Sequence, residues 1–440
     1  MKRVLVLIFC LLSQALLFGR EPVVPKKIQT SSIIKQGEEN LLYPVLVCRF
    51  YELNGAQLFW FTDTPRAGLL QKQLIDLIDS SAYNGIAAKA YHVRELKEKA
   101  GATFSDSSLL FLADRIFTDA AIALFKDMYQ GYKRKPWVGF DQVSEKYSVA
   151  DDDYILKSLL SANAGNLLQA AESLEPADFY YKAMKTELKR YKEGEKKDSV
   201  AGLLLSMSYY RWIRHFNFEK MIVVNLPAAR LYYYEKGTMI LNMKTVVGKP
   251  STPTPRFAAW CNQAILYPYW YVPPSIIFNE YLPIIKNNPS WLDAKNMQVI
   301  DGSGKVLNHH RLNWSSFHPG YFPYSIRQST GCDNALGVIK FNINTPYGVY
   351  LHDTNNKTAF LSGFRYFSHG CIRLEDPIHL GNRLLSDKLD TAFLQSCFKE
   401  QKPIFKPLET AVPVFVVYMP AFPDSKGKMI YYKDVYRLVK

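Results

Sequence analysis

Apolar residues recur every three or four positions through most of residues 40–215. The clearest stretches are 69–79 and 109–129, where apolar side chains would form one stripe along a helix. The same spacing continues in 161–174, 180–191 and 201–216. The Lys- and Glu-rich run 182–197 is typical of a solvated helix and linker. The pattern therefore predicts a helical N-terminal half.

From residue 220 the pattern changes to alternation of apolar and polar positions, rich in β-branched and aromatic residues. It predicts strands at 221–226, 231–235, 239–248, 337–342, 348–352, 414–418 and 429–432. A helix is expected after the N-cap Asp376, with Pro377 as its first residue. His379, Leu380 and Leu384-Leu385 of that helix would face the core.

One long insertion, residues 273–329, separates two groups of predicted strands. Long insertions beside a functional site often act as lids. The helical first half and the strand-rich second half together predict an α+β fold.

Composition and charge limit the classes of function. The 440 residues are 48% hydrophobic and 14% aromatic, which excludes a disordered chain and allows two or three domains. Lys and Arg number 54 against 40 Asp and Glu, so the chain is basic. No long basic run or nucleic-acid motif accompanies this charge. We interpret it as a solvated surface, with attraction to an anionic cell envelope as the alternative.

Residues 1–20 are predicted to be an export signal. Lys2 and Arg3 precede an apolar stretch from Val4 to Phe18, which is shorter than the roughly 20 residues that span a bilayer. Cleavage is expected, with an uncleaved membrane anchor as the alternative. Residues 21–39 are predicted to be a loose segment.

The cysteine count is odd once Cys10, inside the predicted signal, is removed. The remaining cysteines are Cys48, Cys261, Cys332, Cys371 and Cys397. At least one thiol must then stay outside intrachain disulfides, and if it is Cys371 the other four allow three pairings or none. No cysteine or histidine has the spacing of a zinc site, so neither a metal nor a cofactor is expected. His309, His310 and His318 in the insertion are accordingly not interpreted as ligands.

The strongest chemical signal is the run Ser368-His-Gly-Cys-Ile-Arg373, with His352 nineteen residues before the cysteine. A cysteine nucleophile needs a base and N–H groups that can hold an oxyanion. Gly370 leaves the backbone beside the sulfur open to close approach. His352 is too distant in sequence to be a helical neighbour of Cys371, so the two must meet in space. For each of these residues considered alone, the alternative to a catalytic role is a structural one.

This arrangement resembles the L,D-transpeptidases with a YkuD-type catalytic domain, whose signature pairs a histidine with Ser/Thr-His-Gly-Cys. The resemblance runs from about residue 221 to the C-terminus. Residues 334–341 and 348–354 resemble the lead-in strands of that family, and residues 267–276 resemble a segment of its large periplasmic Gram-negative branch. Residues 54–60 and 83–86 resemble that branch's helical scaffold. The glycan-binding helical module common in the branch has no evident counterpart in the sequence.

The resemblance implies a domain organisation. A helical scaffold domain would occupy residues 40–215, and a mostly β catalytic domain would occupy residues 220–440. The insertion at 273–329 would cover the substrate cleft.

The resemblance also assigns roles to the motif residues. Cys371 would be the nucleophile, and His352 its general base and acid, oriented by a backbone carbonyl rather than by a carboxylate. The backbone N–H groups of His369, Gly370 and Cys371 would form the oxyanion hole, with the His369 side chain in support. We expect the imidazole to take the thiol proton and leave an ion pair. Activity should then fall between pH 8 and pH 5, as His352 becomes protonated.

Substrate-binding candidates follow from motif position: Arg373, Tyr350, Ser368, Asn334 and Trp270. Arg373 is expected to hold a substrate carboxylate, with an ion pair to Glu375 or Asp376 as the alternative. Ser368 is also expected to form local hydrogen bonds.

The implied activity is that of a cysteine-dependent acyltransferase of the periplasm. Cys371 would attack a tetrapeptide stem of peptidoglycan, release D-alanine and pass the acyl group to an amine of a second stem, forming a 3→3 cross-link. With water or a different amine as acceptor, the protein would be an L,D-carboxypeptidase or another transferase. A catalytically inactive envelope-binding protein is the alternative from a different class. Expected partners are donor and acceptor stem peptides and carbapenem inhibitors, with no nucleic acid.

Overall fold

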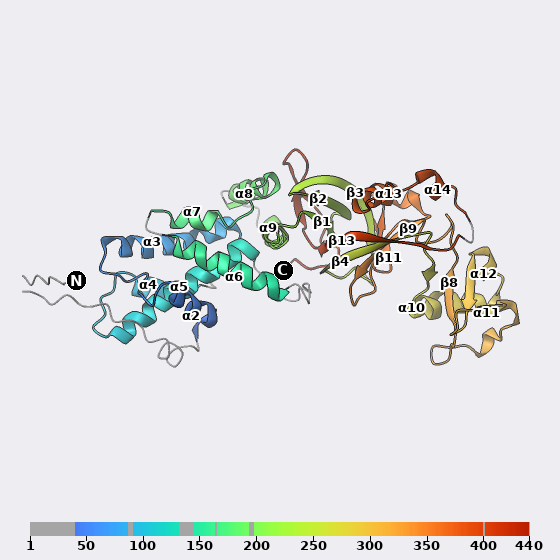
Figure 1. Ribbon diagram of the computed structural model, residues 1–440, viewed down its shortest axis with the longest axis horizontal. Helices are drawn as coiled ribbons and strands as arrows, with labels where there is room; N and C mark the ends of the chain where they lie inside the picture. The colour runs from blue at the N-terminus through green and yellow to red at the C-terminus, as the bar shows by residue number, and fades with distance from the viewer. Residues whose placement is uncertain are drawn as a thin grey trace, which may run out of the picture.

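The computed structural model describes residues 40–86, 91–131, 144–162, 165–192, 198–398 and 401–439. The predicted export signal and the loose segment after it lie outside these ranges. The molecule is elongated, with helices at one end, a large sheet in the middle and a small lobe at the other end (Figure 1). Among the described residues, no helix is both long and apolar enough for a transmembrane span.

The N-terminal half is helical, as its periodicity predicts. Its elements are α2 (Pro44–Leu53), α3 (Pro65–Ser80), η2 (Ser81–Asn84), α4 (Val93–Lys99), α5 (Ser107–Gln130), α6 (Ser144–Leu160), α7 (Leu167–Glu172), α8 (Phe179–Lys192) and α9 (Asp198–His215). Helix α5 begins where the Asp106 carboxylate accepts a hydrogen bond from the Ser108 N–H at 2.7 Å. Its buried face, which includes Phe117, packs in one core with residues of α2, α3, α6 and α7.

A nine-stranded sheet forms the second half. Its strands are β1 (Lys220–Asn225), β2 (Arg230–Glu235), β3 (Thr238–Gly248), β4 (Phe257–Leu266), β9 (Ile339–Asn344), β10 (Leu351–His352), β11 (Tyr366–Ser368), β12 (Ile372–Leu374) and β13 (Ile404–Val417). Their order is β11-β3-β12-β10-β9-β4-β13-β1-β2, and β2 also pairs with β3. That additional pairing joins eight of the strands into a closed ring, which removes most of the free sheet edges.

Helices α8 and α9 pack onto this sheet. Tyr181, Met184 and Leu188 of α8 belong to the same core as the sheet residues, and so do Met207 and Trp212 of α9. The ring of Trp212 meets that of Phe415 edge-to-face at 5.2 Å between centroids. These two helices therefore share the core of the sheet, while α2 to α7 enclose a separate one.

The predicted insertion forms the small lobe at one end of the molecule (Figure 1). Its four-stranded sheet contains β5 (Trp270–Tyr271), β8 (Ser325–Gln328), β6 (Met297–Ile300) and β7 (Val306–Leu307), in that order. Its helical elements are α10 (Pro274–Ile276), the π-helical turn η4 (Ile277–Tyr281), α11 (Leu282–Asn287), α12 (Trp291–Ala294), η5 (His309–Arg311) and η6 (Trp314–Ser316). Because Ile285, Val299 and Ile326 are fully buried here, the lobe has its own core.

The remaining elements complete the second half of the chain. They are η7 (Lys357–Leu361), α13 (Pro377–Leu384), α14 (Thr391–Gln395) and the hairpin of β14 (Ala421–Pro423) and β15 (Met429–Tyr431). The predicted N-cap is confirmed, since the Asp376 carboxylate accepts a hydrogen bond from the His379 N–H at 3.1 Å. The prediction that the His379 side chain faces the core is wrong, because it is 47% exposed.

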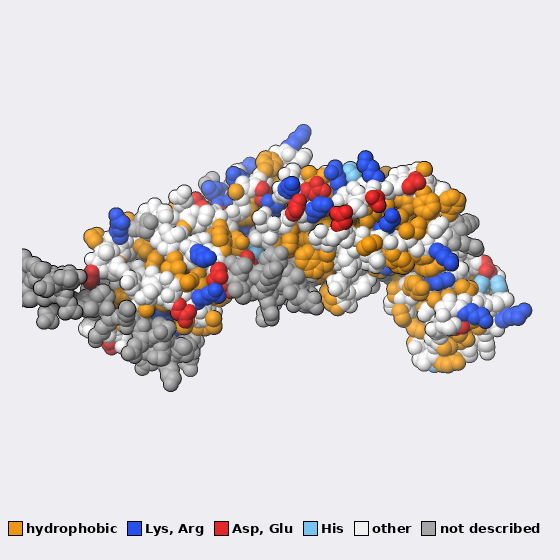
Figure 2. Space-filling model, in the orientation of Figure 1, with side chains coloured by type: hydrophobic (Ala, Val, Ile, Leu, Met, Phe, Trp, Pro, Cys, Tyr) orange, Lys and Arg blue, Asp and Glu red, His pale blue; other side chains and the backbone are white. Residues whose placement is uncertain are grey.

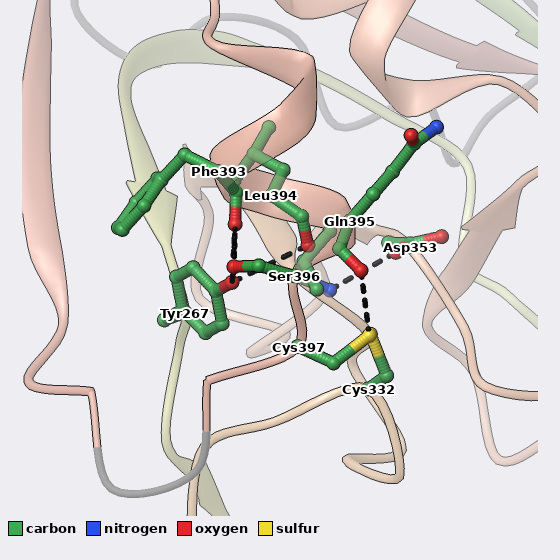
Figure 3. Close-up of a disulfide and its surroundings, with 9 residues drawn as sticks. Tyr267, Cys332, Asp353, Phe393, Leu394, Gln395, Ser396 and Cys397 are labelled. Carbon is green, nitrogen blue, oxygen red and sulfur yellow. Dashed lines mark hydrogen bonds between the residues drawn. A yellow bond between two sulfur atoms is a disulfide. The ribbon is translucent and has the colours of Figure 1, made fainter.

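A disulfide between Cys332 and Cys397 connects the loop before β9 to the segment after α14 (Figure 3). It is one of the pairings that the sequence left open. Beside it, the Tyr267 hydroxyl donates to the carbonyl oxygen of Phe393 at 2.7 Å. The bond closes a loop of 65 residues, which reduces the conformational entropy of the unfolded chain.

Candidate active site

Three neighbouring strands place titratable side chains on one face of the sheet. Leu351 of β10 lies opposite Phe341 of β9 and Ile372 of β12, and all three side chains are buried. Side chains alternate between the two faces of a strand. The next residues, His352 of β10, Lys340 of β9 and Arg373 of β12, are also in register and share the opposite face.

The half-buried Cys371 lies directly before β12, beside this group. The Ile372 N–H donates to the Tyr350 carbonyl at 3.1 Å, which keeps Cys371 next to Tyr350 across the two strands. The Cys371 Sγ is 3.9 Å from the Gly348 carbonyl oxygen. Burial raises the pKa of the thiol. Hydrogen bonds from Tyr350 and the charges of Lys340 and Arg373 oppose this shift without cancelling it.

Tyr350 connects the sulfur to its surroundings. Its ring lies 4.0 Å from the Lys340 Nζ and 5.6 Å, edge-to-face, from the His352 ring. Its hydroxyl interacts with both Cys371 and Trp270. Because Trp270 belongs to β5 of the small lobe, this contact joins the lobe to the sheet beside the sulfur. The structure thus brings Tyr350 and Trp270 to the predicted site.

His352 is a buried, uncharged imidazole. Burial, with smaller effects of Arg373 and Lys340, lowers the pKa of His352 to about 3. Its Nδ1 contacts the Asp353 carbonyl, which can only accept, so Nδ1 carries the proton and the Nε2 lone pair remains available for a base. As the resemblance implies, the orienting group is a backbone carbonyl. The Asp353 carboxylate instead accepts from the Val338 N–H at 3.0 Å and pairs with Lys357.

These shifts contradict the predicted ion pair between Cys371 and His352. A thiol pKa raised by burial and an imidazole pKa of about 3 both favour the neutral forms. The resting site therefore holds a thiol and a neutral imidazole. A His352 pKa of about 3 predicts instead that the imidazole stays neutral from pH 8 to pH 5, so a pH profile of activity distinguishes the two expectations.

The loop before Cys371 is held by its own hydrogen bonds. The buried Ser368 hydroxyl donates to the Cys371 carbonyl at 2.6 Å and accepts from the Gly370 N–H at 3.1 Å. The local bonding predicted for Ser368 is confirmed, but its predicted substrate contact is not supported. Since the Gly370 N–H is already engaged, its predicted place in the oxyanion hole is also not supported in this state. Gly370 has a φ of +123°, which strongly favours glycine.

Asn334 has a structural position rather than one facing a cleft. Its fully buried side chain donates to the carbonyls of Ser329 at 2.8 Å and Pro268 at 3.1 Å, and accepts from the Leu336 N–H at 2.7 Å. These bonds shape the turn that leads into β9. They do not fit the predicted substrate contact.

Arg373 is half-buried beside the sulfur, and the two acids predicted as alternative partners are engaged elsewhere. The Glu375 carboxylate accepts from the Lys244 N–H at 3.0 Å and lies 3.4 Å from the Lys244 Nζ. The Asp376 carboxylate caps α13. Burial lowers the pKa of Arg373, but the ordinary pKa of a guanidinium is so high that the group stays charged.

His369 turns away from the sulfur toward the small lobe. Its Nε2 lies 2.7 Å from the Glu280 Oε1 in the π-helical turn η4. With the Trp270–Tyr350 contact, this is a second connection between the lobe and the sheet. The supporting role predicted for the His369 side chain is compatible with this position.

Lys340 was missed by sequence reasoning. It is half-buried against the Tyr350 ring, within the electrostatic influence of Cys371, and burial lowers the pKa of its amine. The only available signal was its position in a strand whose buried residues alternate with polar ones. That signal does not separate a site lysine from a solvent-facing one.

Comparison with known proteins agrees with this geometry. Residues 219–404 match the family model of the L,D-transpeptidase catalytic domain, and residues 45–188 match that of a Scaffold domain. A Haemophilus influenzae protein provisionally named an L,D-transpeptidase is 25% identical over 401 residues, which cover 91% of this chain and 79% of that protein.

Two solved structures show weaker similarity. An L,D-transpeptidase from Mycobacterium smegmatis is 16% identical over 45% of this chain and 58% of its own, with a TM-score of 0.22. The ertapenem-acylated catalytic domain of the E. faecium enzyme is 16% identical over 45% of this chain and 97% of its own, also with a TM-score of 0.22. Scores this low support no inference about this chain.

The two family models match in the order that the sequence motifs imply, and the helices and sheet of the structure lie where each model matches. The chain therefore contains a YkuD-type L,D-transpeptidase catalytic domain preceded by a Scaffold domain.

Proposed function

We propose that Cys371 is the nucleophile of a peptidoglycan L,D-transpeptidase and that His352 is its general base and acid. The observation that carries this proposal is a half-buried sulfur with Tyr350, Lys340 and Arg373 around it. His352 lies in register with Lys340 and Arg373, and its ring is 5.6 Å from the Tyr350 ring. A buried structural cysteine such as Cys261 needs no neighbouring cations or imidazole.

The first step is acylation by a tetrapeptide stem. The Sγ–C bond forms at the carbonyl of the L-to-D peptide bond, and the bond from that carbon to the D-alanine nitrogen breaks. His352 Nε2 takes the thiol proton during attack and delivers it to the departing amine. Because both groups rest neutral, proton transfer accompanies attack rather than preceding it.

The second step releases the enzyme. The side-chain amine of a second stem attacks the thioester, forms a 3→3 cross-link and gives a proton to His352, which returns it to the sulfur. Water in place of the amine would give L,D-carboxypeptidase activity. The lobe contacts of Trp270 and Glu280 near the site favour restricted water access, and hence transfer to an amine.

Arg373 and Lys340 are the proposed binding groups for the stem. The implied substrate carries carboxylates next to the bond that is cleaved, and two partly buried cations attract them more strongly than solvated ones would. The same cations favour the negative charge that develops on the carbonyl oxygen. The Cys371 N–H is the proposed backbone donor for that oxygen.

An extracytoplasmic location, in the periplasm, is part of the proposal. Structural disulfides persist in oxidising compartments, and the Cys332–Cys397 bond is of this kind. The location agrees with the predicted export signal.

The test is intact-mass spectrometry after incubation with meropenem, followed by reaction with purified muropeptides. A strained lactam should acylate the same sulfur, so one covalent adduct is expected on the unaltered protein and none on Cys371→Ala. His352→Gln should slow adduct formation by roughly 10²-fold or more, the usual contribution of a positioned base.

The products from muropeptides separate the alternatives. Cross-linked dimers support transfer to an amine, and tripeptides alone support L,D-carboxypeptidase activity. If well-folded protein forms neither adduct nor product, the enzyme proposal is wrong and the envelope-binding alternative stands. Circular dichroism on each variant separates loss of chemistry from loss of fold.

A further inference from the structure

The small lobe brings together three side chains that can hold a metal ion. Asp293 of α12, His309 and His310 of η5 each offer one ligand atom, and these atoms lie within 4.8 Å of one another. At the outer end of the lobe, close to α12, Figure 2 shows histidine side chains beside an acidic group. None of the three takes part in the proposed acyl transfer.

The distances from each histidine to Asp293 are close to those of a zinc site, and the three ligand atoms as a group lie within 4.8 Å of one another. His310 Nε2 is 3.0 Å from Asp293 Oδ2, and His309 Nε2 is 3.2 Å from Asp293 Oδ1. Two ligands on one tetrahedral zinc ion are about 3.3 Å apart, given metal–ligand bonds of about 2.0–2.1 Å. Because the side chain of His310 is 48% exposed, it can make the small adjustment that remains.

His309 shows the clearest sign of a missing ligand. Its side chain is about nine-tenths buried, yet among the described residues its Nε2 has no hydrogen-bond partner. The carboxylate oxygen at 3.2 Å is close enough to pair with it but lies outside hydrogen-bond geometry. A buried polar atom without a partner is costly, and a metal ion between the two groups would satisfy both.

The backbone holds the two histidines in place. The Trp314 indole N–H donates to the His309 carbonyl at 2.8 Å, and the Asn308 side chain accepts from the His310 N–H at 3.1 Å. Pre-positioned ligands lower the entropic cost of binding an ion. Two imidazoles and one carboxylate favour Zn²⁺ over Mg²⁺ and Ca²⁺, which prefer oxygen ligands alone.

We propose that Asp293, His309 and His310 form a Zn²⁺ site with three protein ligands. The ion would displace the proton that His310 shares with Asp293 and release it to solvent. It would join α12 to η5 across the β6–β7 hairpin and so stiffen the lobe that contacts the catalytic loop through Glu280. A water molecule would fill the fourth position, since Asp293 and His310 are half-exposed.

The test is titration of the chelator-treated full chain with ZnCl₂ in competition with a chromophoric chelator. Cys371→Ala serves as the background, so that the active-site thiol cannot bind the ion. One equivalent of Zn²⁺ is expected to bind, and Asp293→Asn and His310→Ala should each weaken the affinity roughly tenfold or more. The matched control is His379→Ala, which removes an exposed histidine that pairs with a carboxylate but has no second histidine beside it.

Hydrogen exchange supplies a second readout. Saturating Zn²⁺ should slow exchange across residues 291–311 in the background protein and leave it unchanged in Asp293→Asn. Both Asp293 and His310 are exposed, so these variants are expected to fold. Absence of binding, or equal affinity in the background and in both ligand variants, would overturn the proposal, because the ion would then bind elsewhere or not at all.

Discussion

At the scale of single residues, the main finding is that the proposed nucleophile and base rest in their neutral forms. Burial raises the pKa of Cys371 and lowers that of His352 to about 3. A cysteine enzyme with a preformed thiolate needs the opposite shifts. In the proposed mechanism, proton transfer from Cys371 to His352 therefore accompanies attack and does not precede it.

The pKa of His352 predicts the pH dependence of acylation. The imidazole is a base only when neutral, and it stays neutral until the pH falls toward 3, so the rate of acylation by meropenem should change little between pH 5 and pH 8. The rate should fall only at lower pH, provided that the protein remains folded. The measurement is stopped-flow fluorescence across this range, with circular dichroism at each pH.

A clear inflection near pH 6.5 would contradict this prediction. It would show that His352 titrates like a solvated imidazole, and the sequence-based expectation of activity falling below pH 8 would be right after all. The same shift affects stability. The unfolded chain binds the proton at a higher pH than the folded one, so His352 destabilises the fold as the pH falls from about 6.5 toward 3.

The sequence predicted some site residues and missed others for physical reasons. Cys371 and His352 stand in a motif, whereas the contribution of Lys340 depends on strand register, which sets the residues opposite one another. Ser368 and Asn334 also stand in motifs, but their side chains are used by the loop and the turn that carry the site. Motif position alone does not separate a residue that contacts substrate from one that shapes the backbone.

At the scale of elements, the segment from α10 to α11 joins the small lobe to the loop before Cys371. Helix 274–287 is interrupted by the π-helical turn η4, and Glu280 in that turn contacts His369. Single π turns within helices are frequent at functional sites, because they redirect side chains. Here the turn presents a carboxylate to His369, two positions before the proposed nucleophile Cys371.

Removal of this contact should alter lobe motion more than stability. Glu280→Ala deletes a half-exposed pair worth about 1 kcal/mol at most, so we expect a change of up to about fivefold in the rate of meropenem acylation. The melting temperature should stay nearly constant. Acylation kinetics and differential scanning calorimetry check both statements.

Lys286→Ala is the matched control for this change, because it removes an exposed charge from α11 in the same lobe. The contact is irrelevant to the site if both variants acylate at the rate of the unaltered protein. If Glu280→Ala lowers the melting temperature markedly, the pair has a structural role instead.

Periodicity predicted elements well where one face of the element is buried, as in α3 and α5. It missed β4, which pairs with β9 and β13 in the middle of the sheet and is buried at most positions. A strand covered on both sides loses the alternation that marks it. His379 shows the opposite case. It is exposed although both of its neighbours in sequence are apolar, because it lies on the solvent side of its helix.

At the scale of the whole molecule, α8 and α9 share the core of the sheet. A chain shortened to begin at residue 219 would expose the surfaces that these helices cover, including Phe415 of β13 and Phe422 of the β14–β15 hairpin. Each large side chain uncovered in this way costs about 2 kcal/mol. We expect such a chain to be unfolded or aggregated, whereas one that begins at residue 175 should fold.

Near-ultraviolet circular dichroism and thermal unfolding of the two shortened chains check this prediction. Residue 175 is the chosen start because the buried Arg211 of α9 pairs with Glu175 at 3.0 Å. A chain from residue 219 that melts as cooperatively as the longer one would show that the two helices are dispensable. The sequence alone did not predict this packing, because periodicity marks a buried face without identifying the surface that covers it.

The shared core also constrains how such a protein can change by recombination of gene segments. An exchange that joined a foreign first half at residue 219 would replace α8 and α9 and leave mismatched surfaces against the sheet. An exchange before residue 175 would carry both helices along with the sheet and preserve its core. The unit that can be inherited intact is therefore longer than the segment that contains the catalytic motif.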